Sequence, residues 1–305
     1  MASPEGLAFN ISAAERETGL SKDVLRMWER RYGFPQPTRD ANGERVYASA
    51  EVAKLRAMKR LMDAGVRPGK IIGLDLAALN AMAEARAPLR REAPALEREV
   101  LALLKAHDVV ALSTTLTTLL VRQGLQHFVT DTIAPLNRAV GEAWMRGEVE
   151  VFEEHLYTEQ IQVALRGAIN AFPRHAGSPR ILLTTLPGEL HALGLLMVEA
   201  LIVPEGAQCI SLGPQTPTED IRDAALAHKA QIVALSFSAG FPLRQATEGL
   251  ASLRRELPPA IMLWAGGELT RRVRRTMAGI VLLPDLTSAL TALRSYRAHH
   301  VSQAA

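Results

Sequence analysis

The spacing of apolar residues changes along the chain and divides it into parts of different predicted structure. In the C-terminal part, short apolar runs of strand length alternate with helical stretches; these runs lie near residues 180–185, 208–212, 231–236, 261–265 and 279–283. Such alternation predicts a doubly wound parallel α/β sheet. Between residues 96 and 172 the apolar residues recur at helical spacing, with breaks near His107, Gly124 and Gly147. That pattern predicts four helices packed as an up-down bundle.

The first quarter of the chain has the pattern of a helix-turn-helix. A short helical segment over residues 11–18 has Ser12 as its expected N-cap, and Gly19 then turns the chain. Ser21 is expected to cap a second helix, with Asp23 in the first turn, where the helix dipole favours a carboxylate. A helix, a glycine-containing turn and a second helix form the arrangement that places the second helix in the major groove of DNA.

A small hairpin and two further helices are expected after the second helix. The Asn42-Gly43 pair is a hairpin turn signal and would give the domain a wing. Further helices are expected over residues 49–64 and from Pro68 onward. The predicted parts are a winged helix-turn-helix over 1–80, a linker rich in Ala, Pro and charge over 81–95, a four-helix bundle over 96–175 and an α/β domain over 176–305. The predicted fold class is thus multidomain: an all-α winged helix-turn-helix, a four-helix bundle and a Rossmann-like, doubly wound parallel sheet.

Composition is typical of a folded protein from a reducing compartment. The chain has 305 residues, of which 48% are hydrophobic and 22% charged, so it should bury real cores in two or three domains. The single Cys209 allows no internal disulfide, and residues 1–5 lack the basic and apolar parts of a secretory signal. Apolar stretches such as 109–121 are too short to cross a bilayer. We therefore expect a cytoplasmic protein without a membrane partner.

Basic residues are concentrated in the first quarter. The net charge is only +3, but twelve Lys or Arg stand against six Asp or Glu between Lys22 and Lys70. This excess indicates double-stranded DNA as partner, with the second helix in the major groove and the hairpin on the adjacent backbone. The alternative is that these residues only solvate a helical surface. The candidate DNA contacts are Lys22, Arg26, Arg30, Arg31, Arg39, Arg45 and Tyr47.

Among these candidate DNA contacts, Arg26 is expected to contact a base. Trp28 of the same helix is instead expected in the core, beside Val24 and Leu25. The run Trp-Glu-Arg-Arg-Tyr-Gly-Phe-Pro over residues 28–35, followed by Arg39, Gly43, Arg45 and Tyr47, resembles the N-terminal domain of MerR-type regulators. The resemblance covers about residues 8–75 and implies sequence-specific binding to promoter DNA.

Three short motifs follow apolar runs of the predicted sheet. The first is Glu-Leu-His-Ala-Leu-Gly over residues 189–194, the second is Ser-Phe-Ser over 236–238, and the third is Gly-Gly over 266–267. Residues that follow parallel strands gather at the carboxyl edge of the sheet, where open α/β folds bind ligands. A single histidine in such a place would be read as an ordinary surface residue at a helix start, but three motifs in register indicate a site.

The residue types at these positions suit a cobalt cofactor with a nucleotide tail. His191 can offer an imidazole nitrogen to cobalt, and Glu189 could accept the other ring N–H, which fixes the tautomer. Ser236 and Ser238 can form hydrogen bonds with a nucleotide tail. The three glycines Gly194, Gly266 and Gly267 complete the motifs, and the last two leave room for a tail to pass close to the backbone.

The motifs resemble the D/E-x-H-x-x-G, S-x-L and G-G pattern of proteins that bind cobalamin with its benzimidazole base displaced by a histidine. The resemblance implies that His191 is the lower cobalt ligand. It also implies that all seven motif residues bind the cofactor, namely Glu189, His191, Gly194, Ser236, Ser238, Gly266 and Gly267. Two positions depart from the usual pattern: Ser238 stands where the family usually has Leu, and Glu189 stands where the enzymes of the family usually have Asp.

The bundle contains a further motif, Trp144 followed nine residues later by Glu154-His155. This spacing resembles the W-x9-E-H motif of cobalamin-dependent, light-responsive MerR regulators of the CarH and LitR kind. In that family the bundle caps the upper face of the cofactor, and these three residues surround the adenosyl group. The residue after the Trp is commonly a His that captures cobalt after illumination; here it is Met145. On their own, the three residues would be interpreted as a core Trp and an exposed Glu-His pair.

The resemblance to CarH-type regulators spans nearly the whole chain. It implies a repressor and photoreceptor that binds promoter DNA as a homo-oligomer, either a dimer or a tetramer, with adenosylcobalamin bound. When light breaks the Co–C bond, such a regulator releases the DNA. One alternative is a MerR-type regulator whose cobalamin-like domain senses another signal or binds a protein antirepressor. A cobalamin-dependent enzyme is disfavoured, because the chain lacks a substrate barrel and such an enzyme has no use for a DNA-reading domain. We therefore expect that the protein is not an enzyme.

Overall fold

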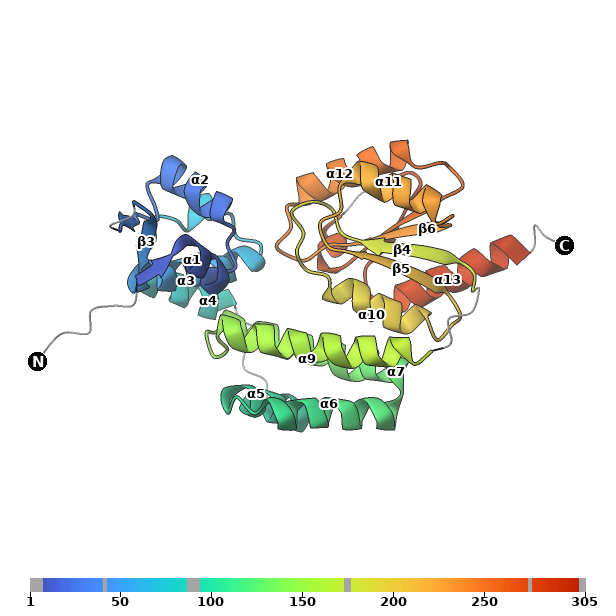
Figure 1. Ribbon diagram of the computed structural model, residues 1–305, viewed down its shortest axis with the longest axis horizontal. Helices are drawn as coiled ribbons and strands as arrows, with labels where there is room; N and C mark the ends of the chain where they lie inside the picture. Colours follow the sequence, from blue (N-terminus) through green and yellow to red (C-terminus); the bar gives the residue numbers. More distant parts are fainter. Residues whose placement is uncertain (1–7, 41–42, 87–93, 173–176, 274–275, 302–305) are drawn as a thin grey trace, which may run out of the picture. The chain divides into compact units, whose positions relative to one another are not determined.

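The computed structural model describes residues 8–40, 43–86, 94–172, 177–273 and 276–301 (Figure 1). It divides into two compact units. One unit comprises Met1–Val109 and Leu136–Tyr157, and the other comprises Val110–Pro135 and Thr158–Ala305. The helices of the middle segment therefore belong partly to one unit and partly to the other.

The N-terminal part of the first unit is a winged helix-turn-helix. Its elements are β1 (Ala8–Asn10), α1 (Ile11–Thr18), α2 (Lys22–Tyr32), β2 (Thr38–Arg39), β3 (Arg45–Ala48), α3 (Ser49–Asp63), a 3-10 turn at Pro68–Lys70 and α4 (Leu76–Arg86). The strands form an antiparallel sheet in the order β1-β3-β2, so the expected hairpin is present as β2 and β3 and gains β1 as a third strand. Asn42, half of the expected turn signal, lies outside the described residues.

Side-chain and glycine caps define the helix-turn-helix. The N-cap of α1 is Asn10, not Ser12 as the sequence led us to expect, because the Asn10 side-chain oxygen accepts the backbone N–H of Ala13 at 2.8 Å. Gly19 ends α1 at φ 66°, and the Ser21 hydroxyl caps α2 by accepting from Val24, as expected. The turn between the two helices is thus defined by Gly19, which ends α1, and by Ser21, which caps α2.

The apolar core of this domain is formed by one face of each helix. Leu25 and Trp28 of α2 are buried in this core, which also contains residues of α3, and this confirms that Trp28 is a core residue. Expectation and structure differ near the end of the domain. The fourth helix begins at Leu76, because Pro68 opens only a 3-10 turn, and α4 buries Ala83 in the same core. Regular helix therefore occupies the first residues of the expected linker, of which residues 87–93 lie outside the described part.

Four helical stretches follow, as the periodicity predicted. They are α5 (Ala95–Lys105), α6 (Val109–Gln123), a stretch in which α7 (Leu125–His127) continues through a π-helical segment (Phe128–Ile133) into α8 (Ala134–Met145), and α9 (Val151–Asn170). Gly124, at φ 75°, separates the second from the third, and Gly147, at φ 73°, follows α8. Among the described helices, none has the length and apolarity that a membrane span requires.

The second unit contains a five-stranded parallel sheet. Its strands are β4 (Arg180–Thr184), β5 (Gln208–Gly213), β6 (Ile232–Ser236), β7 (Met262–Gly266) and β8 (Ile280–Leu283), in the order β5-β4-β6-β7-β8. All five expected strands are confirmed. The helices are α10 (Leu193–Ile202), α11 (Thr218–Ala227), α12 (Leu243–Glu256) and α13 (Leu286–Val301), with a 3-10 turn at Glu268–Arg272. Figure 1 shows α11 and α12 on one face of the sheet and α10 with α13 on the other.

The strand order places a ligand crevice at one defined point. The chain leaves β4 toward β5 on one side and reaches β6 on the other, so the loops after β4 and β6 diverge at the carboxyl edge. Open α/β sheets bind ligands at this switch point. The loop that carries His191 follows β4, and the loop that carries Ser238 follows β6.

Two glycines allow close backbone approaches beside this crevice. A Cβ on Gly194 would lie 2.8 Å from the Ser236 hydroxyl, so the first turn of α10 packs directly on the end of β6. A Cβ on Gly267 would lie 2.2 Å from the carbonyl oxygen of Phe237, and Gly267 has φ 98°, which side chains rarely adopt. The loop after β6 and the loop after β7 are in contact through this bare backbone.

We predict that Gly267→Ala destabilises the α/β domain and Gly266→Ala does not. The first substitution adds a backbone clash to a conformation that costs about 1–3 kcal/mol for a non-glycine residue. The second places its Cβ no closer than 3.7 Å to any neighbour. Urea unfolding of the two variants, followed by circular dichroism, measures the difference. Equal stability of the two variants would show that the contact between these loops is not tight.

Candidate functional site

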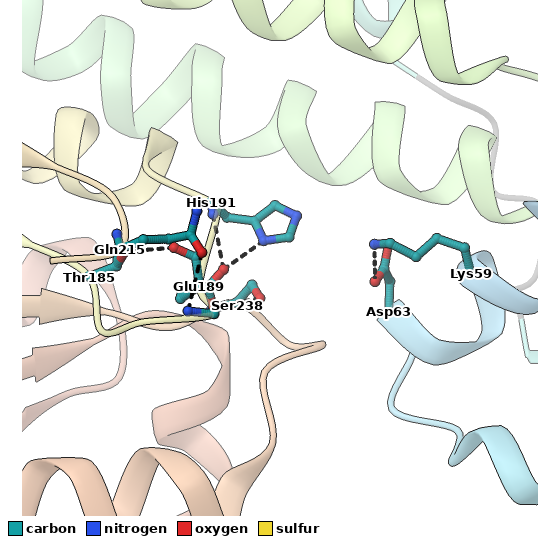
Figure 2. A network of polar contacts seen from close by, with 8 residues as sticks. Lys59, Asp63, Thr185, Glu189, His191, Gln215 and Ser238 are labelled. Carbon is teal, nitrogen blue, oxygen red and sulfur yellow. Dashed lines mark hydrogen bonds and ion pairs between the residues drawn. The ribbon is translucent and has the colours of Figure 1, made fainter. Parts of the chain in front are cut away.

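The loop between β4 and α10 places Glu189 inside the protein and His191 at its surface. The Glu189 side chain is 1% exposed, whereas the His191 side chain is 58% exposed. The Thr185 hydroxyl donates to the Glu189 carbonyl oxygen at 2.6 Å and accepts the backbone N–H of Gln215 at 2.8 Å. The loop is therefore fixed to the neighbouring loop after β5, and His191 is held at the carboxyl edge of the sheet (Figure 2).

Four hydrogen bonds converge on the Glu189 carboxylate. Its Oε1 accepts the His191 ring Nδ1 at 2.7 Å and the His191 backbone N–H at 3.0 Å. Its Oε2 accepts the backbone N–H and the hydroxyl of Ser238, both at 2.8 Å. Figure 2 shows these bonds joining the loop after β4 to the loop after β6. The two positions that depart from the usual cobalamin motif, Glu189 and Ser238, are thus bonded to each other.

These bonds keep the carboxylate charged. Burial by itself raises the pKa of Glu189, but the bonds from the His191 ring and from the backbone N–H groups of His191 and Ser238 outweigh it, so the pKa lies below its usual value. An ionised Glu189 accepts the Nδ1–H of the neutral imidazole, which leaves Nε2 as the nitrogen that carries a lone pair. Metal-binding histidines are commonly oriented by a carboxylate in this way.

A cavity of about 750 Å³ lies on the sheet face that α13 covers. Its walls are β7, β8 and one side of α13, and they include Trp264, Leu283 and Tyr296. Trp264 is fully buried, and among the described residues its indole Nε1 has no hydrogen-bond partner. A buried donor without an acceptor destabilises the folded state by about 1–3 kcal/mol. An acceptor atom that reached the Trp264 indole N–H would therefore be stabilising.

The remaining candidate cofactor residues lie in the first unit. Trp144 is half-buried near the end of α8; the side chain of Glu154 is 37% exposed and that of His155 is 62% exposed in the first turns of α9. The His155 ring and the Glu154 carboxylate lie 3.8 Å apart. The structure therefore brings Glu154 and His155 together, while the residues around His191 belong to the second unit.

A buried carboxylate that the sequence did not indicate fixes the start of α9. Glu153 accepts the backbone N–H of Glu150 at 2.7 Å, the Lys105 ammonium at 2.7 Å and a contact from the His107 ring at 3.3 Å. Burial raises the pKa of Glu153, but these bonds outweigh it and hold the pKa below its usual value. The next two residues, Glu154 and His155, are thereby held at a defined angle around the helix.

Met145 packs against the apolar core of the helix-turn-helix domain. Close by in the chain, a Cβ on Gly147 would lie 3.2 Å from the Arg60 guanidinium, and Glu150 pairs with Arg56 at 3.6 Å. The end of α8 and the start of α9 are therefore docked on α3. The thioether of Met145 is part of this contact.

The candidate DNA contacts fall into two groups. Arg26, Arg30 and Arg31 of α2 and Arg39 of the hairpin are exposed, whereas Lys22 is partly exposed and lies 3.6 Å from Glu15. Arg26 lies 3.4 Å from Asp23, and Arg39 donates to the Gly43 carbonyl at 2.6 Å. These residues lie where a nucleic acid could contact them.

Arg45 and Tyr47 do not lie as expected. Arg45 donates to Glu29 at 2.8 Å and is only partly exposed, so its guanidinium already has an anionic partner. Tyr47 is fully buried, and its hydroxyl has no partner among the described residues. The reason is strand alternation: Tyr47 faces inward from β3 and packs in the core of the domain. Its placement as a DNA contact is corrected accordingly.

Comparison with known proteins accounts for both units. Residues 9–76 match the MerR HTH family of regulatory proteins, and residues 96–166 and 179–293 match two models of the B12 binding domain. The HTH-type transcriptional repressor CarH of Myxococcus xanthus is 31% identical over 271 residues, which cover 86% of this chain and 90% of that protein. The chain belongs to the CarH family of MerR-type, B12-binding regulators. It is a DNA-binding transcriptional regulator that carries cobalamin-binding domains, not an enzyme.

One further relative and one solved structure are also similar to this chain. The repressor CarA of Myxococcus xanthus is 29% identical over 238 residues, 76% of this chain and 77% of that protein. The monomethylamine corrinoid protein of Methanosarcina barkeri is 15% identical, has a TM-score of 0.51 and covers 65% of this chain and 96% of that chain. At that identity the likeness shows a shared fold.

The residues of the second unit fit the cofactor of this family. The carboxylate-oriented imidazole of His191 suits a cobalt ion, and the cavity under α13 has the size and the apolar walls of a small-molecule pocket. The unmet donor of Trp264 suits a ligand with acceptor atoms. Sequence reasoning missed Trp264 because a Trp within a strand reads as core; only the strand register shows that it faces α13.

We predict that Glu189→Gln weakens cobalamin binding by about 10–100-fold, the usual effect of losing the partner of a metal-binding histidine. The substitution removes the charge and places an amide NH2 group against the donors of Ser238. Ser238→Ala should have a smaller effect, since the backbone N–H of residue 238 still donates to Glu189. Titration of each variant with the cofactor, followed by absorption, measures the affinity. The control is Glu248→Gln, which changes an exposed carboxylate on α12. Unaltered affinity in Glu189→Gln would show that the pair does not orient a cobalt ligand.

Proposed function

We propose that this regulator is a light-responsive repressor that binds promoter DNA as a homo-oligomer with adenosylcobalamin bound and releases the DNA after illumination. The observation that carries the cofactor part is the Glu189–His191 pair, because its geometry presents an imidazole to a metal at the switch point of a B12-binding domain. A homo-oligomer, either a dimer or a tetramer, is included because the family resemblance implies one.

His191 would be the lower cobalt ligand, with the benzimidazole base displaced. Glu189 would keep the Nδ1–H in place, and Ser238 would keep Glu189 in place. The nucleotide tail would pass from this edge toward the face that α13 covers and enter the cavity there. The residues along its path would be Gly194, Ser236, Gly266 and Gly267. The cofactor would contribute a Co–C bond that light can break, which is chemistry of the cofactor itself.

Trp144, Glu154 and His155 would surround the adenosyl group. The half-buried indole offers a flat apolar wall, and the two polar side chains offer contacts for ribose and adenine. Support comes from the match of residues 96–166 to a B12 binding domain and from the fixed start of α9. A shift of this segment would reach the DNA-reading domain directly, because Met145 and Glu150 are docked on it.

Met145 favours a second candidate function, in which the domain senses another signal such as the cofactor level. A thioether is a weaker ligand for Co(III) than imidazole, and here it is already packed against the helix-turn-helix core. Capture of cobalt from above by this residue is therefore disfavoured. Light would still break the Co–C bond, but the illuminated protein would not form a stable bis-histidine adduct through this position.

DNA binding should depend on the exposed arginines of α2. We predict that Arg30→Ala weakens binding and lowers the slope of log K against log salt by about 0.9, the value for one lost phosphate contact. Arg244→Ala, which removes an 88% exposed arginine from α12, is the control and should change neither quantity. Affinity measured by fluorescence anisotropy over a salt series gives both numbers. If the salt slope of Arg30→Ala equals that of the wild type, Arg30 does not contact a DNA phosphate.

The complete proposal predicts a band shift on the gene's own promoter that requires adenosylcobalamin in the dark and is lost after illumination. The absorption spectrum of the same illuminated sample should lack the bis-imidazole form, and Met145→His should produce it. A shift that needs the cofactor but persists in light would support the second candidate. A shift that ignores the cofactor would contradict both.

A further inference from the structure

The cavity under α13 is apolar on the sheet side and hydroxyl-bearing on the helix side. Trp264 and Leu283 contribute from β7 and β8. Thr287, Thr291 and Ser295 contribute from α13 at intervals of four residues, so they lie along one side of that helix. A planar, partly apolar group with a few acceptor and donor atoms would fit such walls.

Trp264 is the group on these walls with an unmet hydrogen bond. Its two neighbours in β7, Leu263 and Ala265, face the opposite side of the sheet and pack in the core formed with α11 and α12. By strand alternation Trp264 faces α13, where it lines the cavity. It is completely buried, and its Nε1 has no acceptor among the described residues. Native proteins seldom leave such a donor unpaired, so an acceptor from a ligand is the simplest completion.

We propose that Trp264 determines specificity for the lower nucleotide of the cofactor, by donating its indole N–H to an acceptor atom of that nucleotide. This inference rests on the proposed cobalamin binding and goes beyond it, since it assigns recognition of the tail to one side chain. This hydrogen bond strengthens the binding of a corrinoid that carries the nucleotide and does not affect the binding of one that lacks it. Trp264 is thus a specificity residue, whereas His191 is the ligand of the metal.

The test compares two corrinoids on two variants. Adenosylcobalamin carries the nucleotide, and adenosylcobinamide lacks it. Trp264→Phe keeps an aromatic ring and removes the N–H, so it should weaken adenosylcobalamin about tenfold, the effect of one buried hydrogen bond, and leave adenosylcobinamide unchanged. Trp144→Phe is the matched control: it alters the proposed adenosyl wall and should affect the two corrinoids equally. Equilibrium titrations of the wild type and both variants in the dark give the affinities for each corrinoid.

The outcomes separate this inference from the function on which it rests. If the wild type binds neither corrinoid, the proposed cofactor is wrong. If both bind and Trp264→Phe weakens both equally or neither, Trp264 does not read the nucleotide.

A measurement on the wild type guards against a variant that folds poorly. In protein with 15N-labelled tryptophan, the indole N–H signal of Trp264 should shift with adenosylcobalamin more than with adenosylcobinamide. The same shift with both ligands would overturn the inference.

Discussion

The geometry at the carboxyl edge of the parallel sheet depends on one buried carboxylate. Glu189 is enclosed at the switch point of the sheet, and it is tolerable there only because four donors from two loops converge on it. Those donors tie the loop after β4 to the loop after β6 and set the imidazole of His191 with Nδ1 inward. Loss of the loop after β6 would leave the buried carboxylate with only the two donors of His191. The same four bonds therefore hold the edge together and define which nitrogen a metal can reach.

The first unit has a corresponding constraint where the end of α8 meets the helix-turn-helix domain. Met145 packs in the helix-turn-helix core, and Glu150 pairs with Arg56 of α3, so the end of α8 and the start of α9 are fixed to the domain that carries the recognition helix. Glu153 orients the following residues through Lys105 and Glu150. A ligand can shift a conformational equilibrium only through contacts that differ between its states. In this chain such contacts at Trp144 or His155 would act on a segment already attached to the DNA reader.

Much of this arrangement could be predicted from the sequence, and the exceptions have physical reasons. Strand-length apolar runs placed all five parallel strands, since buried parallel strands have strong and local patterns. The motif residues at 189, 191 and 238 were predicted to gather because they follow neighbouring strands. The bond between Glu189 and the His191 ring was expected, but the bonds from Ser238 to Glu189 were not, since they depend on the longer reach of Glu189 and on the Ser238 hydroxyl. Tyr47 and Trp264 were misplaced or missed for one reason: the face of a strand residue depends on register, which charge and motif spacing do not reveal.

The central claim, that His191 binds cobalt through the nitrogen opposite Glu189, can be tested on the unaltered protein. Reduced Co(II) cobalamin shows nuclear coupling from its axial nitrogen in the electron paramagnetic resonance spectrum. In protein labelled with 15N-histidine and loaded with unlabelled cofactor, the account predicts that each line changes from a triplet to a doublet, because the axial nitrogen comes from the protein. Triplets that persist would show that the benzimidazole base stays on the metal and would contradict the account.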